Sequence, residues 1–215
     1  MSLCAIVPIK PLRRGKSRLS SVLSEQNREG LNQYLLNSTL DCLSNIPEID
    51  QIIVVSYDPT VLTLARKYGV RTVLESRNSN INRALRKATI AAVAVKATKV
   101  LIVPADIPFL NKSSIYEVIG MTGDSPEIII VPDRKSSGTN LMLINPIGAI
   151  KYDFGEWSFR KHIEQAERKK VKVKVCRCDN LTFDLDWPED WDYLIHINSP
   201  ANKPIVDNLL QEVRI

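Results

Sequence analysis

The chain begins with MSLCAIVPIKPLRRGKSRLS (residues 1–20), a short apolar run followed by a cationic loop. Residues 4–7 have the continuous apolar pattern of a buried strand, and helical periodicity starts after the loop. Between Lys10 and Arg18 five cations fall within nine residues, which costs free energy unless an anion compensates them. In an open α/β sheet, the loop after a strand lies where ligands bind. A solvated basic loop is the plain alternative, but the position after the first strand favours a polyphosphate-binding loop.

The composition is that of a globular protein with one sizeable core. Of 215 residues, 44% are hydrophobic and 25% are charged, so we expect one domain over residues 1–215. Residues 198–215 should form a tail that packs on the body or on a partner subunit. No apolar run approaches the roughly 20 residues that a bilayer-spanning helix needs. No signal peptide opens the chain either, so we expect no membrane association.

The net charge of +5 is modest and suits a nucleotide ligand. In the clearest basic run, residues 168–175, lysines come to alternate with valines, which predicts an edge strand whose lysines face water. Few aromatic residues interleave with these cations, so we expect no nucleic-acid partner.

The four cysteines indicate a reducing compartment rather than a metal site. Cys4 and Cys42 lie in apolar stretches, as core thiols do, and Cys176 and Cys178 form a C-x-C pair in a strand-like run. No second Cys/His pair follows at zinc spacing, which argues against a metal-thiolate site. We therefore expect a cytoplasmic protein.

Apolar runs and helical periodicity alternate along the rest of the chain. The pattern predicts strands at residues 51–56, 70–74, 99–104, 127–132 and 140–144. It predicts helices from a cap at Ser24 to Ser44, at 60–68, from a cap at Asn80 or Asn82 to about residue 97, from Ser113 or Ser114 to about Gly120, and at 205–213. Strands that alternate with helices indicate an α/β fold with a mainly parallel sheet flanked by helices.

Asp106 closely follows the apolar strand at residues 99–104. It should project from the carboxyl edge of the sheet, into the same crevice as the first loop. A carboxylate that faces a cationic loop is explained if it binds Mg²⁺, because this ion takes hard oxygen ligands and bridges carboxylates to phosphate oxygens. A helix N-cap or an ordinary loop aspartate is the alternative.

A second acidic segment is DLDWPED, residues 184–190. Asp184 and Asp186 share one face if this segment is extended. Pro188 should open a helix, and Glu189 and Asp190 suit its positive end. Helix capping does not account for Asp186 or for the D-x-D spacing. Two carboxylates distant in sequence, together with a basic loop, are what metal-dependent transfer to or from a nucleotide requires.

Two polar turns lie between these segments. Thr139 can offer a hydroxyl and a backbone N–H to an anion, and Gly138 permits close approach. Gly155 and Ser158 stand at the start of a predicted helix, which is a ready site for phosphate or carboxylate. His162 is a weak candidate for a general base, since such a histidine is more often packed or hydrogen-bonded inside the protein.

These motifs occur in a recognisable order: VPIKP (7–11), GKSRL (15–19), PADIP (104–108), GTN (138–140), SF with a histidine (158–162), DLD (184–186) and PED (188–190). Together they resemble the 2-phospho-L-lactate guanylyltransferase family over roughly residues 5–195. The resemblance implies a Rossmann-like, GT-A type nucleotidyltransferase fold. It also implies that GTP and (2S)-2-phospholactate are joined into lactyl-2-diphospho-5'-guanosine with release of pyrophosphate, on the route to coenzyme F-420 of methanogens. A homodimer is implied as well.

The same resemblance implies roles for the basic loop and the two aspartates. Asp106 and Asp186 would hold Mg²⁺ and, with Lys16, form the catalytic group. Lys10, Lys16 and Arg18 would bind the phosphates of GTP. This loop lacks the glycine-rich pattern of the wider superfamily, so its cationic side chains would do more of the phosphate binding.

The remaining roles concern the base and the acceptor. Asn82 would contact the base or the ribose of the nucleotide, although Asn80 stands where relatives often have glycine. Thr139, Gly155 and Ser158 would bind the phosphate or carboxylate of the acceptor. That acceptor is already an anion, so no strong general base is required.

The sequence leaves several alternative functions open. Bacterial relatives are similar but use phosphoenolpyruvate as acceptor. Another nucleotidyltransferase of the same fold could act on a different phosphorylated or sugar-phosphate acceptor. A GT-A glycosyltransferase is a rival because D-x-D motifs on such sheets also bind metal and nucleotide-sugars. A nucleotide-binding regulator without catalysis is less favoured.

Overall fold

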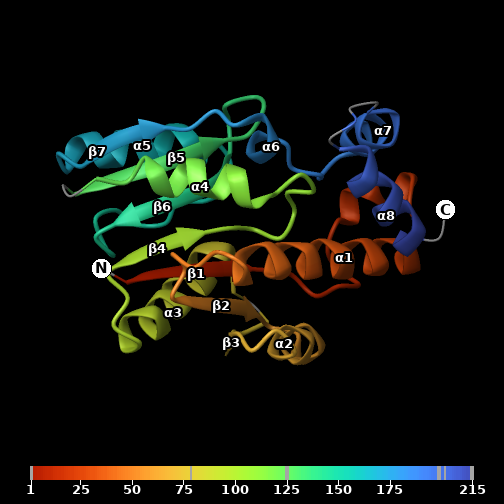
Figure 1. The fold of residues 1–215 in the computed structure, drawn as a ribbon, viewed down its shortest axis with the longest axis horizontal. Coiled ribbons are helices and arrows are strands. Elements are labelled where there is room, and N and C mark those ends of the chain that lie inside the picture. The colour runs from red at the N-terminus through yellow and green to blue at the C-terminus, as the bar shows by residue number, and fades with distance from the viewer. Residues whose placement is uncertain (1, 78, 124–125, 198–199, 201, 214–215) are drawn as a thin grey trace.

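A computed structural model describes residues 2–77, 79–123, 126–197, 200 and 202–213. Within these residues, seven strands form one sheet in the order β3-β2-β1-β4-β6-β5-β7 (Figure 1). The strands are β1 (Leu3–Pro8), β2 (Gln51–Ser56), β3 (Arg71–Leu74), β4 (Lys99–Ile102), β5 (Glu127–Pro132), β6 (Thr139–Asn145) and β7 (Lys172–Val175). The expected strands, including the edge strand β7, are confirmed. The expectation that the lysines of β7 face water is wrong for Lys174, whose ammonium lies 2.8 Å from Oε2 of the buried Glu127.

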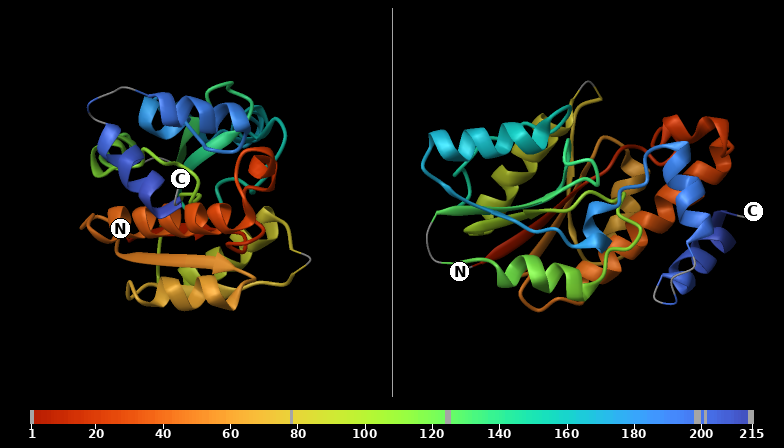
Figure 2. Two further views of the ribbon diagram at one scale, coloured as in Figure 1. Left: turned by 90° about the vertical axis from the view of Figure 1, so that its right-hand side faces the viewer. Right: turned by 90° about the horizontal axis from the view of Figure 1, so that it is seen from above.

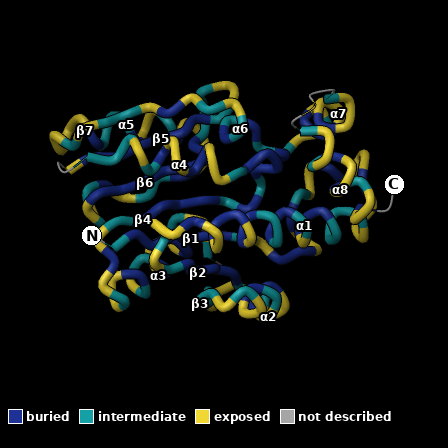
Figure 3. The backbone as a smooth tube through the Cα atoms, viewed as in Figure 1, coloured by how far each residue is buried: buried dark blue, intermediate teal, exposed yellow. Residues whose placement is uncertain are grey.

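The sheet is mainly parallel. β1 pairs in parallel with both β2 and β4, so Ile6 lies between Ile53 and Ile102. β6 runs antiparallel to β4 and to β5, because a short polar turn joins β5 directly to β6 as a hairpin. The central strands are almost entirely apolar because helices cover both of their faces, and Figure 3 shows β1 and most of β4 buried.

Helices pack on both faces of the sheet (Figure 2). They are α1 (Glu25–Ser44), α2 (Pro59–Arg66), α3 (Ile81–Ala94), α4 (Lys112–Gly120), α5 (Ser158–Arg168), α6 (Asp179–Thr182), α7 (Pro188–His196) and α8 (Lys203–Val213), with a 3-10 turn, η1 (Ser17–Ser21). Side chains alternate along β1, so Ala5 and Val7 join the core beneath α1, α2 and α4. Cys4 and Ile6 join the core beneath α3 and α5.

Side-chain caps set most helix starts that the sequence predicts. Ser24 Oγ accepts from the backbone N–H of Asn27 at 3.1 Å, and Asn80 Oδ1 accepts from the N–H of Arg83 at 3.0 Å. The expected start of α4 at Ser113 or Ser114 is wrong. Asn111 caps that helix instead, because its side-chain oxygen reaches the N–H of Ser114 at 2.9 Å.

A third apolar cluster closes the end of the molecule where α7 and α8 lie (Figure 1). It joins η1, α1, α7 and α8 through side chains that include Leu19, Leu35 and Leu209. The hydroxyl of Tyr34 on α1 donates to the carbonyl of Ile205 at 3.3 Å. In the described part of the tail, α8 therefore packs on the body of the protein.

Two further findings bear on the environment of the protein. Among the described residues, none of the helices combines the length and apolar character that crossing a membrane requires. All four cysteines are free thiols, and Cys4, Cys42 and Cys176 are buried.

The strand order creates a switch point beside β1. The chain proceeds from β1 outward to β2 and β3, and then returns to place β4 on the other side of β1. The loops that leave β1 and β4 consequently diverge at the carboxyl edge of the sheet, where a crevice forms between them. Ligand-binding residues are expected in this crevice.

Candidate active site

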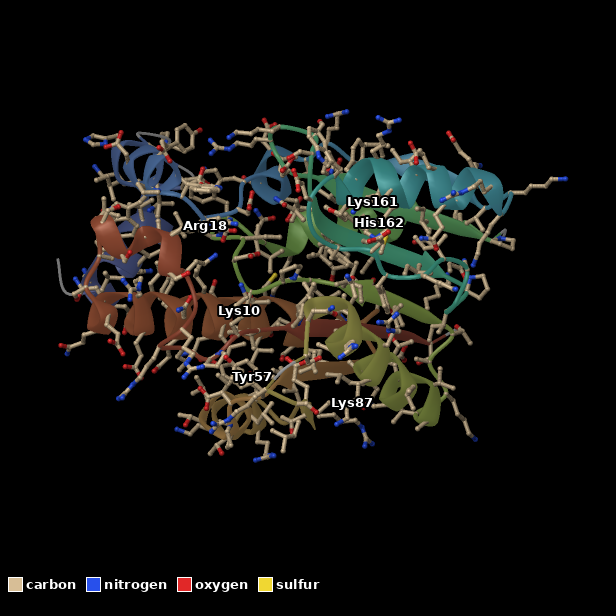
Figure 4. All side chains as sticks on the ribbon, turned by 180° about the vertical axis from the view of Figure 1, so that it is seen from behind. Lys10, Arg18, Tyr57, Lys87, Lys161 and His162 are labelled. Carbon is tan, nitrogen blue, oxygen red and sulfur yellow. The ribbon has the colours of Figure 1, made fainter. Side chains whose placement is uncertain are left out.

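Two adjoining clefts occupy the carboxyl edge of the sheet. The first, of about 560 Å³, follows the ends of four adjacent parallel strands. Glu75 after β3, Tyr57 after β2, Lys10 after β1 and Asp106 after β4 all line it. In Figure 4, Lys10 lies between Tyr57 and Arg18.

The second cleft, of about 450 Å³, extends toward β6 and the start of α5. Its lining includes Thr139, Gly155 and Ser158, together with Arg18 and Asp184. The residues that line both clefts are Lys10, Lys16, Ile81, Pro104, Asp106 and Asp186. The clefts therefore meet at a group of two aspartates and two lysines.

Lys16 lies at this junction. Its backbone is left-handed, with φ of 54°, and its side chain is only 6% exposed. The Lys16 ammonium lies 3.0 Å from Asp186 Oδ1 and 3.8 Å from Asp106 Oδ2. Arg18 reaches the other oxygen of Asp186 at 3.4 Å and stacks over the ring of Trp187 at 4.3 Å. One lysine thus links two carboxylates that are 80 residues apart in the chain.

Of the other cations of the first loop, two line the clefts and Arg13 lies outside them. Lys10 and Arg18 line the clefts with Lys16. Arg13 instead forms an exposed ion pair with Glu29 on α1, at 3.1 Å. The three cations that line the clefts are therefore those for which the family resemblance implies contacts with the phosphates of GTP.

Backbone contacts hold the second acidic segment against the loop after β4. The N–H of Leu185 donates to the carbonyl of Asp106 at 3.0 Å. Asp190 Oδ2 accepts from the N–H groups of Asp186 and Trp187, at 3.0 and 2.8 Å. The other oxygen of Asp190 pairs with Arg134. The position of Asp186 therefore depends on the first turn of α7.

The aspartates and Lys16 at the junction shift one another's pKa values. Burial lowers the pKa of Lys16, but the Asp106 and Asp186 carboxylates outweigh this effect and raise its pKa above the usual value. Burial, and then the negative charges of Asp106 and Asp186, raise the pKa of Asp184 to about 7. Burial raises the pKa of Asp106 despite the opposing charge of Lys16. Burial acts in the same direction on Asp186, but Lys16 and Arg18 prevail and lower its pKa.

This donor set fits a magnesium ion. Carboxylate oxygens are the hard ligands that the ion prefers, and the three aspartates lie close enough together that Asp106 and Asp186 raise the pKa of Asp184. Among the described residues, no group of three or more His, Cys, Asp and Glu side chains is placed so that it could hold a metal ion. One or two carboxylates, completed by water and phosphate oxygens, are the usual protein contribution to Mg²⁺ binding.

In the second cleft, Thr139 is held by a buried histidine. Asp153 donates its backbone N–H to His162 Nε2 at 3.0 Å, which places the ring proton on Nδ1. Nδ1 lies 3.1 Å from Thr139 Oγ1 and donates to it. The hydroxyl hydrogen of Thr139 is then available to an anion.

His162 itself is poorly suited to proton transfer. The residue is fully buried, and this burial lowers its pKa to about 4. Both ring nitrogens are hydrogen-bonded, and the ring packs edge-on against Phe154 with centroids 5.0 Å apart. The structure therefore gives His162 the packed role that the sequence favoured over a general base.

The turn between β5 and β6 and the start of α5 shape the same cleft. Asp133 accepts from Ser137 and from the N–H of Gly138 at 2.9 Å, so the turn is fixed by one carboxylate. Gly155 has φ of 129°, which strongly favours glycine, and Ser158 begins α5 as expected. Gly155 and Ser158 thus lie in the cleft with Thr139.

Asn82 lies differently from its expected place. Its amide nitrogen donates to the carbonyl of Phe154 at 3.0 Å, and its oxygen accepts from the N–H of Phe154 at 2.8 Å. Neither cleft is lined by Asn82. The side chain bridges α3 to the loop before α5, and a contact with the nucleotide base stays a prediction.

Sequence reasoning missed three residues that line the first cleft. Tyr57, Glu75 and Arg77 each follow the end of a strand on the β3 side of the sheet. Their place directly after predicted parallel strands could have indicated them, because the loops that follow parallel strands all lie at the carboxyl edge of the sheet.

Comparison with known proteins places this geometry in a family. The family described as "Guanylyl transferase CofC like" matches residues 3–214. A protein of Rubrobacter xylanophilus named phosphoenolpyruvate guanylyltransferase is 38% identical, over 88% of this chain and 92% of its own. A protein of Methanobrevibacter smithii named 2-phospho-L-lactate guanylyltransferase is 34% identical, over 88% of this chain and 82% of its own.

Solved structures share the fold at low identity. A nucleotidyl transferase from Methanothermobacter thermautotrophicus superimposes with a TM-score of 0.62 at 12% identity, covering 98% of both chains. A 4-diphosphocytidyl-2C-methyl-D-erythritol synthase from Anaerococcus prevotii gives a TM-score of 0.61 at 15% identity, covering 95% of this chain and 96% of its own. The expected nucleotidyltransferase fold is confirmed. The chain is a nucleotidyltransferase and belongs to the CofC-like guanylyl transferase family.

Proposed function

We propose that this protein transfers the guanylyl group of GTP to 2-phospho-L-lactate, giving lactyl-2-diphospho-5'-guanosine and pyrophosphate in coenzyme F-420 biosynthesis. One observation carries the proposal: two clefts meet at Lys16, Asp106 and Asp186. A nucleotide in the first cleft and a small anion in the second would bring their phosphates together at this junction. Phosphoenolpyruvate is the second candidate acceptor, because the relative from Rubrobacter xylanophilus is named for it.

The chemistry asks the protein for position and charge rather than for a base. An oxygen of the acceptor phosphate attacks the α-phosphorus of GTP, a new P–O bond forms, and the bond to the β-phosphate oxygen breaks to release pyrophosphate. Lys16 would neutralise the charge that accumulates between the two phosphates, and Lys10 and Arg18 would hold the GTP phosphates in line. Thr139, Gly155 and Ser158 would orient the acceptor.

Mg²⁺ is the cofactor that we propose for this reaction. Asp106 and Asp186 would hold it, with phosphate oxygens and water as its other ligands. The ion supplies charge neutralisation to the phosphates when it is bound. Asp106 and Asp186 would at the same time fix Lys16 beside it.

The proposal also covers the oligomeric state of the protein and the cellular compartment in which it works. A homodimer in the cytoplasm follows from the family resemblance, and four free thiols suit a reducing compartment. Light scattering at micromolar concentration measures the mass directly. A single 24.2 kDa species at every concentration would contradict the dimer.

The decisive assay is pyrophosphate release with Mg²⁺ and GTP. We expect release that depends on 2-phospholactate and is absent without an acceptor. Release with phosphoenolpyruvate alone would keep the mechanism and change the acceptor. Hydrolysis of GDP- or UDP-sugars, with no release from GTP plus either acceptor, would contradict the proposal and support a glycosyltransferase.

A further inference from the structure

Glu75 lines both the first cleft and a smaller hollow beside it. It comes directly after β3, and its backbone N–H pairs with the carbonyl of Ser56 at 3.0 Å. Its Oε2 atom is buried from solvent and accepts no hydrogen bond from the residues that the structure describes. A buried carboxylate oxygen without a donor costs free energy, so its presence at a ligand cleft calls for a ligand that donates.

Neighbouring cations do not account for this carboxylate. Arg77 lines the same cleft, and Arg83 and Lys87 share a smaller hollow of about 210 Å³ with Glu75. Among the described residues, no ion pair joins Glu75 to any of them, and the Lys87 ammonium donates to the carbonyl of Leu74 at 2.6 Å. Lys87 also lies at the outer face in Figure 4, on the far side of Tyr57 from Arg18.

The position of Glu75 suits the base end of a nucleotide. Strands in a sheet are about 4.8 Å apart, so the ends of β3 and β4 are separated by three spacings, or about 14 Å. The phosphate-binding side chains Lys10 and Lys16 belong to the β1 end of the cleft, beside Asp106. A nucleotide whose phosphates lie there must direct its base toward β3. Tyr57 lines the cleft on that side and offers its ring to a base, and Ile81, which lines both clefts, adds apolar surface nearer the junction.

Among the common bases, guanine supplies the donors that this carboxylate lacks. Its N1–H and 2-amino group lie side by side on one edge, and an ionised carboxylate accepts two parallel hydrogen bonds. Adenine and cytosine place a ring nitrogen lone pair at the corresponding position, which repels a carboxylate. Uracil has one N–H between two carbonyl oxygens.

We propose that Glu75 determines the choice of guanine by accepting hydrogen bonds from N1–H and the 2-amino group of the base. The inference rests on the proposed function, in which the first cleft takes the nucleotide. It assigns specificity to a residue at the β3 end, about 14 Å from the junction at which transfer takes place.

The test is equilibrium binding of nucleotides with Mg²⁺ and without an acceptor. Wild-type protein should bind GTP at least about 10-fold more tightly than inosine triphosphate, which lacks the 2-amino group. It should also prefer GTP to xanthosine triphosphate, whose 2-carbonyl oxygen opposes the carboxylate. Equal affinities for GTP and inosine triphosphate would overturn the inference without any variant.

Glu75→Gln sharpens the test because a glutamine amide offers one acceptor and one donor. We expect GTP affinity to fall about 10- to 100-fold. The advantage of GTP over inosine triphosphate should disappear, and xanthosine triphosphate should gain relative to GTP. Glu167→Gln makes the same chemical change on an exposed residue of α5 and should alter none of these ratios.

The outcomes separate this inference from the proposed function. An equal loss for all three nucleotides in Glu75→Gln would assign Glu75 to the ribose or to the fold, and would overturn base selection. Absence of transfer to either acceptor, combined with the predicted loss of base preference in Glu75→Gln, would refute the acceptor chemistry and leave base selection standing. Circular dichroism verifies that Glu75→Gln folds. If it does not fold, the relative affinities of wild-type protein for GTP, inosine triphosphate and xanthosine triphosphate test base selection on their own.

Discussion

Lys16 carries the charge balance of the active site. Its ammonium is the direct cationic link between Asp106 and Asp186, and its side chain is only 6% exposed. Lys16→Met keeps most of the side-chain volume and removes the charge. We predict a loss of about 10²- to 10³-fold in kcat, because a preorganised charge at the reacting phosphates is removed.

The same variant should respond more strongly to Mg²⁺. Without Lys16 the three aspartates repel one another, so added Mg²⁺ should raise the melting temperature of Lys16→Met by more than that of wild type. Lys67→Met, an exposed lysine after α2, is the matched control and should behave as wild type does. Unchanged kcat in Lys16→Met would remove this lysine from the mechanism.

His162 should make the fold sensitive to acid. Burial lowers its pKa to about 4, below the value of about 6.5 for an unfolded histidine. The unfolded chain therefore binds the proton first as the pH falls. The stabilising contribution is complete above about pH 6.5 and is lost between about pH 6.5 and pH 4, by on the order of 3 kcal/mol.

Urea unfolding at pH 7, 6 and 5 checks this expectation against His162→Gln, whose side chain does not titrate. The difference in unfolding free energy between wild type and the variant should shrink as the pH falls. A difference that stays constant across this range would mean that His162 is not held neutral by the fold.

At the scale of elements, α7 positions Asp186. Its first-turn residue Asp190 accepts from the N–H of Asp186 and from that of Trp187, and it pairs with Arg134. We predict that Asp190→Ala lowers the unfolding free energy by about 1 kcal/mol, as the loss of a cap does. It should also lower kcat, because Asp186 loses its support.

Glu189→Ala is the control for this effect. Glu189 lies in the same turn and is exposed, so its loss should leave kcat nearly unchanged. If Asp190→Ala keeps full activity while it loses stability, α7 supports the fold but not the position of Asp186. Raising the Mg²⁺ concentration should partly restore Asp190→Ala if Asp186 is merely displaced.

The sequence predicts the bounds of helices and strands better than it predicts how strands pair or which residue caps a helix. Strands such as Gln51–Ser56 and Glu127–Pro132 were correctly bounded because continuous apolar runs end in polar turns. The antiparallel direction of β6 is a property of the assembled sheet and has no periodicity of its own. Asn111 was overlooked as a cap because nearby serines compete for that role in the sequence pattern.

Site residues were likewise predictable only where the expected fold alone determines their position. Asp106 and Lys16 follow strand β4 and strand β1, so their meeting at one edge followed from the expected fold. Asn82 could not be placed in this way, because its two hydrogen bonds go to Phe154, 72 residues away. Glu75 belongs to no motif: its place after a predicted strand was the available signal, and its unsatisfied oxygen is visible only in the folded protein.

At the scale of the whole molecule, two clefts should bind two ligands separately. Most of the residues that line one cleft do not line the other, so Mg²⁺ with GTP and the acceptor alone should each raise the melting temperature. Thr139→Val and Ser158→Ala should reduce the shift that the acceptor causes and preserve the shift that GTP causes. Loss of both shifts together would indicate one shared site instead of two.

The central claim is that guanylyl transfer takes place where the clefts meet, and GTP labelled at the α- or the γ-phosphate tests it most directly. With Mg²⁺ and 2-phospholactate, the α-label should appear in a product that also contains the acceptor, and the γ-label in pyrophosphate. Asp106→Asn should abolish both while it keeps the fold. Release of the γ-label as inorganic phosphate, with the α-label left in GDP, would contradict the claim.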